Sequence, residues 1–226
     1  MKDIIRNVKG TKDILPDQSY IWLYVENFIH YHFSRFGYKE IRTPSFENTD
    51  LFLRSIGQET DIVSKEMYSW IDQGGKKITL RPELTASVVR SYIQNQLGKQ
   101  NKSHKFYYLG SSYRRERPQK GRFRQFKQFG LEAFGSSLPE QDAEIIYMSY
   151  SLYDSLGIKN LELKINSIGN RDSRKKYKKA LQNYFIKFEN NLTETNKKRL
   201  KTNPLRLLDT KVDSEIELIK DAPKII

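Results

Sequence analysis

A stretch rich in arginine near the middle of the chain carries side chains that bind anions. Residues 113–132 read YRRERPQKGRFRQFKQFGLE. Arginine clamps a carboxylate or a phosphate through the planar fork of its guanidinium N–H groups. The acceptors Gln128 and Glu132 follow, and both could receive N–H donors from an ammonium group or a ring. The charges alone leave two interpretations open, a basic solvated hairpin tip and a site for a small charged ligand.

The alternation of residues predicts two strands, 105–115 and 126–135, on either side of a loop. Successive side chains of a strand point to opposite faces, so Arg114, Gln128 and Glu132 should share one face. Gly110 and Gly130 lie on the same face, and their lack of side-chain bulk should open room for a ligand above the sheet. The opposite face should be core and carries Tyr107, Leu109, Phe129, Leu131 and Ala133.

The loop between these strands adds further cations. It carries Arg117, Lys120, Arg122 and Arg124, and its Gly121 allows a tight bend. Cations spaced along a loop can follow a phosphodiester or a triphosphate. The chain has no G-x-x-x-x-G-K-[ST] phosphate loop, so an ATP site would be built from side chains on a sheet.

A further carboxylate, Glu83, lies in TLRPELT, residues 79–85. It follows a predicted strand and comes just before a predicted helix. Two roles therefore stay open, a ligand contact and a carboxylate that complements the helix dipole.

Periodicity and turn residues place the remaining elements. The first 16 residues read as an irregular arm, and Pro44 implies that strand 38–46 lies at a sheet edge or is broken. A hairpin is predicted over 66–71 and 76–81, and a half-buried strand over 161–169. Helices are predicted over 17–36, 84–97, 137–156 and from 172 onward, with a short helix and loop in 51–61. The pattern indicates antiparallel strands with helices packed on one side, an α+β fold.

Two domains are expected. The chain becomes Lys-rich and helical from Asp172 onward. We therefore divide it into an α+β core, 1–168, and a helical part, 169–226, whose apolar face includes Tyr177, Leu181 and Phe185.

The composition limits partners and cofactors. Lys and Arg number 40 against 27 Asp and Glu, a net charge of +13 that suggests a polyanionic partner, although a coding bias toward Lys is an alternative. The chain has no cysteine, and His30 and His32 point to different faces of a predicted helix, so no metal site is predicted. No apolar signal core and no stretch of about 18 apolar residues occur, so we expect a cytoplasmic protein without a membrane segment.

Five stretches in this order resemble the class II aminoacyl-tRNA synthetases and, among them, the histidyl-tRNA synthetases. The resemblance covers essentially the whole chain, and the hairpin stretch is its most specific part. The stretches are VKGTKDILP at 8–16, GYKEIRTPSFENTDLF at 37–52, TLRPELTA at 79–86, YRRERPQKGRFRQFKQFGLEAFG at 113–135 and LKINSIGNRDSRKKY at 163–177.

The resemblance implies an antiparallel sheet flanked by helices, with the start of a helical insertion after 169 and a homodimer formed through the first class motif. It implies that histidine and ATP–Mg²⁺ react to histidyl-adenylate and that the acyl group passes to tRNA(His). Arg114 would be catalytic and would bind the α-phosphate and the histidine carboxylate. The other implied contacts are Glu83, Thr85, Gln128 and Glu132 for histidine, Glu116 and Arg122 for ATP, and Gln119 and Arg124 for the tRNA acceptor end.

The chain departs from the family pattern in one respect. The family carries later active-site pieces, an RGLDYY-like stretch and a third class motif, that do not occur here. We therefore expect this piece alone to have little or no activity. Two alternatives remain, the non-catalytic regulatory subunit of ATP phosphoribosyltransferase, which resembles the same core, and a basic RNA-binding module.

Overall fold

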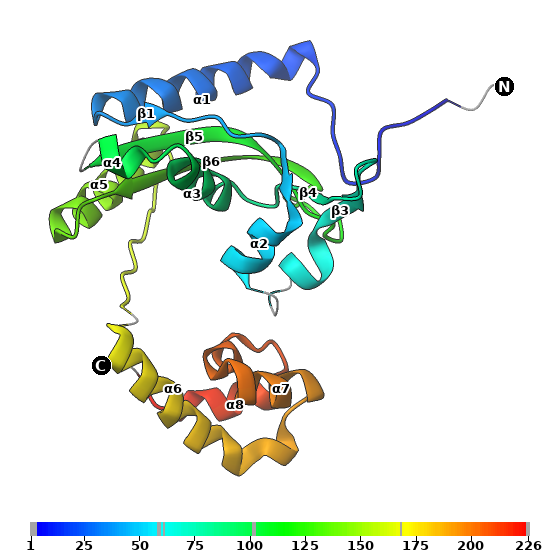
Figure 1. The fold of residues 1–226 in the computed structure, drawn as a ribbon, viewed down its shortest axis with the longest axis vertical. Coiled ribbons are helices and arrows are strands. Elements are labelled where there is room, and N and C mark those ends of the chain that lie inside the picture. Colours follow the sequence, from blue (N-terminus) through cyan, green and yellow to red (C-terminus); the bar gives the residue numbers. More distant parts are fainter. Residues whose placement is uncertain (1–3, 58–59, 61, 101–102, 168, 225–226) are drawn as a thin grey trace. The chain divides into compact units, whose positions relative to one another are not determined.

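The computed structural model describes residues 4–57, 60, 62–100, 103–167 and 169–224 (Figure 1). The chain divides into two compact units, Met1–Leu161 and Glu162–Ile226, and each is described by itself. The boundary that the sequence predicted follows Ile168, which lies outside the described residues. No helix in the described part of the chain is long and apolar enough to cross a membrane.

The first unit is built on a long hairpin. Strands β5 (His104–Tyr113) and β6 (Gln125–Phe134) pair antiparallel along their whole length. The short strand β1 (Lys39–Glu40) pairs with β5 in parallel, so this sheet is mixed and not purely antiparallel as predicted. The α+β class is confirmed, and the predicted strand pair 105–115 and 126–135 is the β5–β6 hairpin.

A second sheet has the strand order β2-β4-β3 and is antiparallel. Its strands are β2 (Phe46–Asn48), β3 (Tyr68–Ile71) and β4 (Lys77–Leu80). The predicted strand 38–46 is broken into β1 and β2 around Pro44, because proline has no N–H for a sheet ladder.

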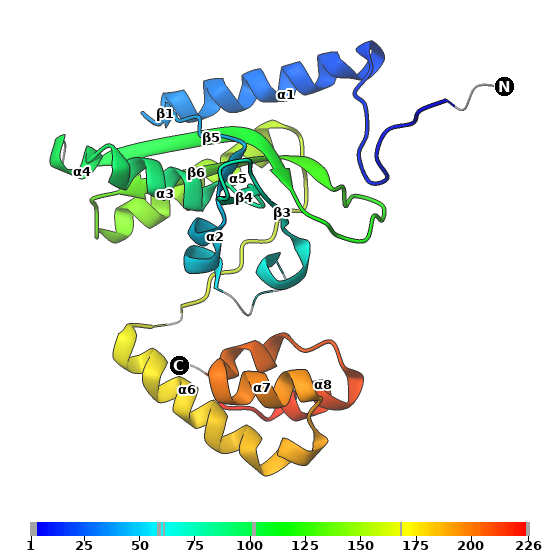
Figure 2. The ribbon, with the colours of Figure 1, turned by 45° about the vertical axis from the view of Figure 1, so that its right-hand side comes forward.

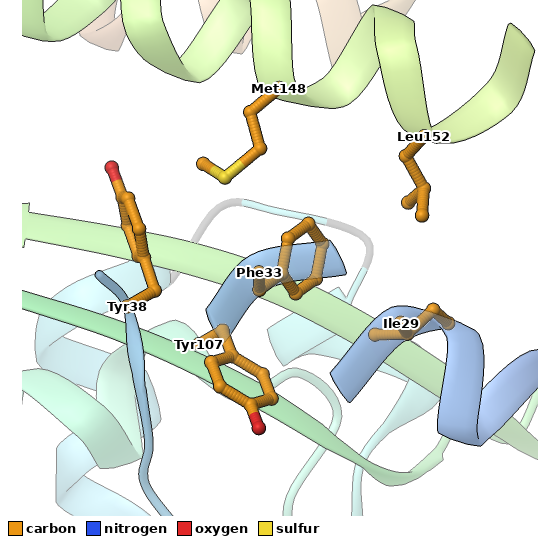
Figure 3. Packing of buried hydrophobic residues seen from close by; sticks show 6 residues of the cluster. All are labelled: Ile29, Phe33, Tyr38, Tyr107, Met148 and Leu152. Atoms are coloured by element: carbon orange, nitrogen blue, oxygen red, sulfur yellow. The ribbon is translucent and has the colours of Figure 1, made fainter. Parts of the chain in front are cut away.

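Helices α1 (Pro16–Arg35) and α5 (Pro139–Ser155) cover the predicted core face of the hairpin. Ile29 and Phe33 of α1 meet Tyr107 of β5 and Met148 of α5 in one buried cluster (Figure 3). Leu109, Phe129 and Leu131 pack against this cluster, which confirms the assignment of that face. The two helix histidines also form hydrogen bonds here: His30 Nδ1 lies 2.9 Å from the Tyr107 hydroxyl, and His32 Nε2 lies 3.0 Å from the Met148 carbonyl oxygen.

Helix α3 (Thr85–Gln94) packs on the other face of the hairpin (Figure 2). Its Val88 and the preceding Leu84 form a buried cluster with Tyr108, and Phe106 and Phe134 pack against it. Helices therefore cover both faces of β5–β6, and the prediction that they lie on one side is wrong. The remaining elements of this unit are α2 (Thr49–Ile56), a π-helical turn at Ile62–Glu66 and α4 (Leu97–Gln100).

The strand predicted over 161–169 is absent from the described residues of that segment. Leu163 and Ile165 are 56% and 73% exposed. Alternating apolar residues place an apolar face on one side of an extended segment. A strand also needs a neighbouring strand whose backbone pairs with its N–H and C=O groups. No described strand pairs with this segment.

The second unit is helical, as predicted. Leu181, Phe185, Leu200 and Leu207 form its buried centre, and Tyr177 and Tyr184 pack against them. Its elements are α6 (Arg171–Phe185), a 3₁₀ segment (Ile186–Asn191), α7 (Glu194–Thr202), a second 3₁₀ segment (Pro204–Asp209) and α8 (Asp213–Lys220).

A buried carboxylate joins three segments of this unit. Glu215 in α8 is 2% exposed and accepts hydrogen bonds from the Thr193 N–H at 2.6 Å and the Thr210 hydroxyl at 2.6 Å. The Asn196 side-chain amide also donates to it. Burial by itself would raise the pKa of Glu215, but these donors outweigh it and the pKa is lowered.

We expect Glu215→Gln to destabilise the second unit selectively. The glutamine side chain would place an N–H donor among three groups that also donate, and this should lower the free energy of unfolding of the unit by about 2–3 kcal/mol. Far-UV circular dichroism should show an earlier loss of helix, whereas fluorescence from Trp22 and Trp70, both in the first unit, should report an unchanged transition.

The same donors lower the pKa of Glu215, so this stabilisation should be lost as the pH falls through the folded-state pKa. Glu217→Gln, in the same helix and exposed, is the matched control, and equal transitions for both variants would contradict the prediction.

Candidate functional site

The polar face of the hairpin carries a row of predicted ligand residues. In the β5–β6 register, Gly110 faces Gln128 and Tyr108 faces Gly130. Three hydrogen-bonded groups follow one another along this face: Glu132 with Tyr108, Gln128 with Ser112, and Arg114 beyond the end of β5. The structure therefore brings Arg114, Gln128 and Glu132 onto one face of the sheet, as the alternation predicted.

Glu132 lies at the end of this row that is farthest from Arg114. The Tyr108 hydroxyl donates to its carboxylate at 3.3 Å, and the Thr85 hydroxyl lies 3.1 Å from the Tyr108 hydroxyl. Burial raises the pKa of Glu132, and the nearby carboxylate of Glu83 raises it further, against the lowering effect of bonds from Thr85 and Tyr108. Burial likewise raises the pKa of Tyr108 to about 12. A partly desolvated carboxylate in this position can accept a hydrogen bond from a cationic ligand in a low dielectric.

The two glycines of the face do not open room for a ligand, and that prediction is wrong. A Cβ at Gly130 would lie 2.2 Å from the Tyr108 hydroxyl oxygen, so the tyrosine ring lies directly over this glycine. A Cβ at Gly110 would lie 2.5 Å from a guanidinium nitrogen of Arg81. Both glycines therefore accommodate side chains of the protein itself.

Arg81 is a buried cation held by backbone carbonyls. Its side chain is 6% exposed and donates to the carbonyl oxygens of Ser111 at 2.8 Å, Thr43 at 2.7 Å and Pro44 at 3.2 Å. Burial lowers its pKa. Arg81 thus joins the broken segment around Pro44 to strand β5 and supports the floor of the site.

Arg114 is oriented from several directions. Its Nε donates to the Pro82 carbonyl oxygen at 2.9 Å, and its guanidinium carbon lies 5.2 Å from the ring centroid of Phe126. Oε1 of Glu116 lies 3.9 Å from Nη1 of Arg114, and Oε2 of Glu116 lies 3.3 Å from Nη1 of Arg122. The Glu116 carboxylate therefore lies between two cations. A fixed guanidinium of this kind can hold an anionic group with little reorganisation.

Glu83 and Thr85 lie at the start of α3. The Glu83 carboxylate accepts from the Ala86 N–H at 2.9 Å, which is the helix-terminal role left open by the sequence. Both residues line a cavity of about 840 Å³ between α2 and α3, together with Leu51, Arg90 and Ile93. Arg114, Gln128 and Glu132 do not line this cavity, and Thr85 connects to the sheet face through Tyr108.

The hairpin loop turns tightly at Gly121, which has φ +81°, as predicted. The Arg122 N–H donates to the Gln119 carbonyl oxygen at 2.9 Å and closes this turn. The backbone of Arg124 stays near the stem, because its carbonyl oxygen accepts from the Arg114 N–H at 3.0 Å. Gln119 and Arg124 are therefore on the loop beyond the sheet face that holds Gln128 and Glu132.

Sequence reasoning gave no role to Tyr108, Phe126 or Arg81. Tyr108 has the same strand parity as Gly110 and so belongs to the polar face, but only its position over Gly130 reveals that it supports Glu132. Arg81 stands beside Glu83 in TLRPELT, and its burial was not predicted. The three carbonyl oxygens that surround Arg81 come from residues 43, 44 and 111, so the sequence around Arg81 gives no local sign of them.

Residues 10–170 match the family described as Histidyl-tRNA synthetase. The chain belongs to the histidyl-tRNA synthetase family. A histidine–tRNA ligase from Macrococcus caseolyticus is 53% identical over 218 residues, which are 96% of this chain and 52% of that protein. A crystal structure of apo S. aureus histidyl-tRNA synthetase has a TM-score of 0.76 at 40% identity, over 96% of this chain and 54% of the other.

The family likeness has two limits. The chain spans about half the length of the curated relatives it matches. A structure described as an ATP phosphoribosyltransferase regulatory subunit/histidyl-tRNA synthetase from Bacillus halodurans has a TM-score of 0.62 at 19% identity, over 98% of this chain and 60% of that one. At that identity it shows the fold alone.

Proposed function

We propose that this chain is the part of a histidine–tRNA ligase that binds histidine and the ATP α-phosphate on the polar face of β5–β6. The observation that carries the proposal is the row from Glu132 through Gln128 to Arg114, with acceptors at one end and a fixed cation at the other. Histidine has a matching polarity, since its ammonium and imidazole N–H groups need acceptors and its carboxylate needs a cation. Glu83 and Thr85 would complete the histidine contacts.

The proposed reaction needs no covalent bond to the protein. The histidine carboxylate attacks the α-phosphorus of ATP, pyrophosphate leaves, and the acyl group then passes to the terminal ribose of tRNA(His). Arg114 would orient the carboxylate and stabilise charge on the α-phosphate, which by analogy with other oxyanion donors is worth on the order of a hundred- to a thousandfold in rate. Glu116 and Arg122 would contact ATP, and Gln119 and Arg124 the tRNA acceptor end.

Magnesium would enter with ATP. The described residues contain no group of three or more His, Asp or Glu side chains that could hold a metal ion. Glu116 is the carboxylate beside Arg114 and could provide one oxygen ligand. Mg²⁺ commonly takes one or two carboxylates and completes its shell with phosphate oxygens and water, so this donor set fits an ion carried mainly by the nucleotide.

Titration of the 226-residue chain with L-histidine and with ATP, followed by NMR, tests the proposal. We expect histidine to shift the resonances of residues around Glu132 and ATP those around Arg114. By itself the chain should give little histidine-dependent pyrophosphate exchange, because it spans about half of its relatives. If the chain bound neither histidine nor ATP, the proposal would be overturned. Pyrophosphate exchange near the rate of a full-length relative would overturn the expected inactivity.

A regulatory subunit of ATP phosphoribosyltransferase is the second candidate, since its fold is similar. The cationic loop favours the ligase, because a histidine sensor without tRNA or nucleotide chemistry has little use for Arg117, Arg122 and Arg124. Binding of tRNA with a steep salt dependence would support the ligase. Association with a phosphoribosyltransferase and no tRNA binding would support the regulator.

A homodimer is part of the proposal. The N-terminal half of α1 exposes consecutive apolar side chains: Tyr20 is 65%, Leu23 59% and Tyr24 63% exposed. A second copy packed along this helix would cover them, in keeping with the first class motif. Light scattering of the chain tests this, and a monomer at high concentration would contradict it.

A further inference from the structure

Arg81 has one guanidinium nitrogen that the hydrogen bonds to its carbonyl partners do not use. Nε donates to the Ser111 carbonyl oxygen, and Nη1 donates to those of Thr43 and Pro44. No hydrogen bond within the described part of the chain involves Nη2, and Nη2 is not among the fully buried unpartnered atoms there, so it keeps some contact with solvent. Two N–H donors of this cation therefore have no protein acceptor.

This nitrogen lies on the polar face of the hairpin. A Cβ at Gly110 would be 2.5 Å from Nη2 of Arg81, and Gly110 stands directly opposite Gln128 in the β5–β6 register. Glu132 lies further along β6 in one direction, and Arg114 follows the end of β5 in the other. Nη2 is therefore located between the acceptor end and the cationic end of the row.

Arg81 has no carboxylate partner on the protein. It is buried, and no ion pair among the described residues includes it. Burial lowers its pKa, because the charged form loses hydration. The side chain of Arg114 reaches the neighbouring residue, since its Nε donates to the Pro82 carbonyl oxygen. An anion bound on this face could therefore be shared by two guanidinium groups.

The length of histidine matches the position of Nη2. Successive residues of a strand rise about 3.3 Å, so the distance along β6 from Glu132 to Gln128 is about 13 Å. Histidine measures about 6 Å from its ring to its carboxylate, and a hydrogen bond of about 2.9 Å at each end brings the span to about 12 Å. When the ring donates to Glu132, the carboxylate therefore comes to the level of Gln128 and Gly110, where Nη2 lies.

We propose that Arg81 is a ligand-binding residue of this site and that its Nη2 donates to the carboxylate of bound histidine above Gly110. The inference rests on the proposed function and deepens it, because it gives the histidine carboxylate a second arginine beside Arg114. The three carbonyl oxygens hold the guanidinium in place before the ligand binds, so little reorganisation is needed. A side chain at position 110 would occupy the place of Nη2, which accounts for the glycine.

Arg81→Lys and a pair of ligands test this contact. L-Histidinol carries a CH₂OH group where L-histidine has its carboxylate, and each is titrated by calorimetry into the 226-residue chain. The substitution keeps the charge but removes Nη2, and we expect it to weaken histidine binding about tenfold to a hundredfold, as for other hydrogen bonds to charged groups. The affinity for L-histidinol should stay nearly unchanged. An equal loss for both ligands would show a purely structural role and overturn the inference, with the proposed function still standing.

Arg42→Lys is the matched control. It makes the same substitution beside Thr43, at a side chain that is 80% exposed, and should change the affinity for neither ligand. ATP provides a further arm of the test, because the α-phosphate is the other anion proposed for this face. If Arg81→Lys weakened ATP binding and left histidine binding unchanged, Nη2 would serve the phosphate and the inference would be overturned.

The unaltered chain gives an independent measurement, which decides the question even if Arg81→Lys does not fold. In the NMR spectrum, the side-chain N–H resonances of Arg81 should shift when L-histidine is added and stay in place with L-histidinol. Histidine binding without such a shift would overturn the inference and leave the contacts proposed for Glu132 intact. A chain that bound no histidine at all would overturn the proposed function and the inference with it.

Discussion

Replacing Glu132 by glutamine should remove most histidine binding and at the same time stabilise the protein at neutral pH. Under the proposed function the carboxylate accepts a charged N–H donor from histidine, and loss of such a bond weakens binding by about tenfold to a hundredfold. In the unliganded chain the same carboxylate is partly desolvated, which raises its pKa. An amide keeps the contact with Tyr108 and Thr85 but has no charge to desolvate.

The pH dependence of stability follows from the direction of this shift. The folded state holds the proton of Glu132 to a higher pH than the unfolded state, whose carboxyl has an ordinary pKa. Stability therefore falls as the pH rises from the unfolded-state pKa through the folded-state pKa. We expect Glu132→Gln to melt higher than the parent chain above this window, and the difference to vanish below it.

Thermal melts at a series of pH values, together with histidine titrations, check both parts. Glu140→Gln is the control, because it removes an exposed carboxylate from the first turn of α5, where the charge favours the helix. Glu140→Gln should leave histidine binding intact, and it should not raise the melting temperature at any pH. A Glu132→Gln variant that bound histidine normally, or that melted lower at neutral pH, would contradict the assignment of Glu132.

The hairpin and its two faces were predictable because strand alternation is a local property. Tyr107 and Phe129 fell on the core face, and Gln128 and Glu132 on the polar face, from their parity alone. The pairing of a strand is a different matter. Segment 161–169 alternates in the same way, yet no described strand pairs with it, because a partner strand is set by topology.

The support of the site was less predictable than its polar residues. The residue types of Arg114 and Glu132 by themselves indicate an anion-binding cation and a hydrogen-bond acceptor. The burial of Arg81 against the carbonyl oxygens of Thr43 and Ser111 depends on elements that are far apart in the sequence. The same holds for Gly130, where the sequence indicated space for a ligand and the structure has a tyrosine ring. A glycine shows that something comes close, but its neighbour in space is set by the fold.

Gly130→Ala should therefore destabilise the protein and abolish histidine binding together. The new Cβ would lie 2.2 Å from the Tyr108 hydroxyl oxygen and 2.4 Å from its Cζ, both well inside van der Waals contact. Tyr108 is 6% exposed and packs against Leu84 and Val88, so the ring has little room to move. Overpacking of this kind costs about 3 kcal/mol. Any displacement of the ring also removes the hydroxyl that contacts Glu132.

A double-mutant cycle with Tyr108→Ala separates the two explanations for this glycine. If Gly130 accommodates the ring, adding Gly130→Ala to Tyr108→Ala should cost little more, and urea denaturation should give a coupling of more than about 1 kcal/mol. Gly74→Ala, whose nearest neighbour would be Asp72 at 3.4 Å, is the control for a tolerated alanine. If Gly130 instead cleared space for histidine, Gly130→Ala would weaken binding at unchanged stability and the cycle would show no coupling. The coupling energy thus decides between two roles for Gly130. Either it accommodates the Tyr108 ring, which positions Glu132, or it leaves room for bound histidine.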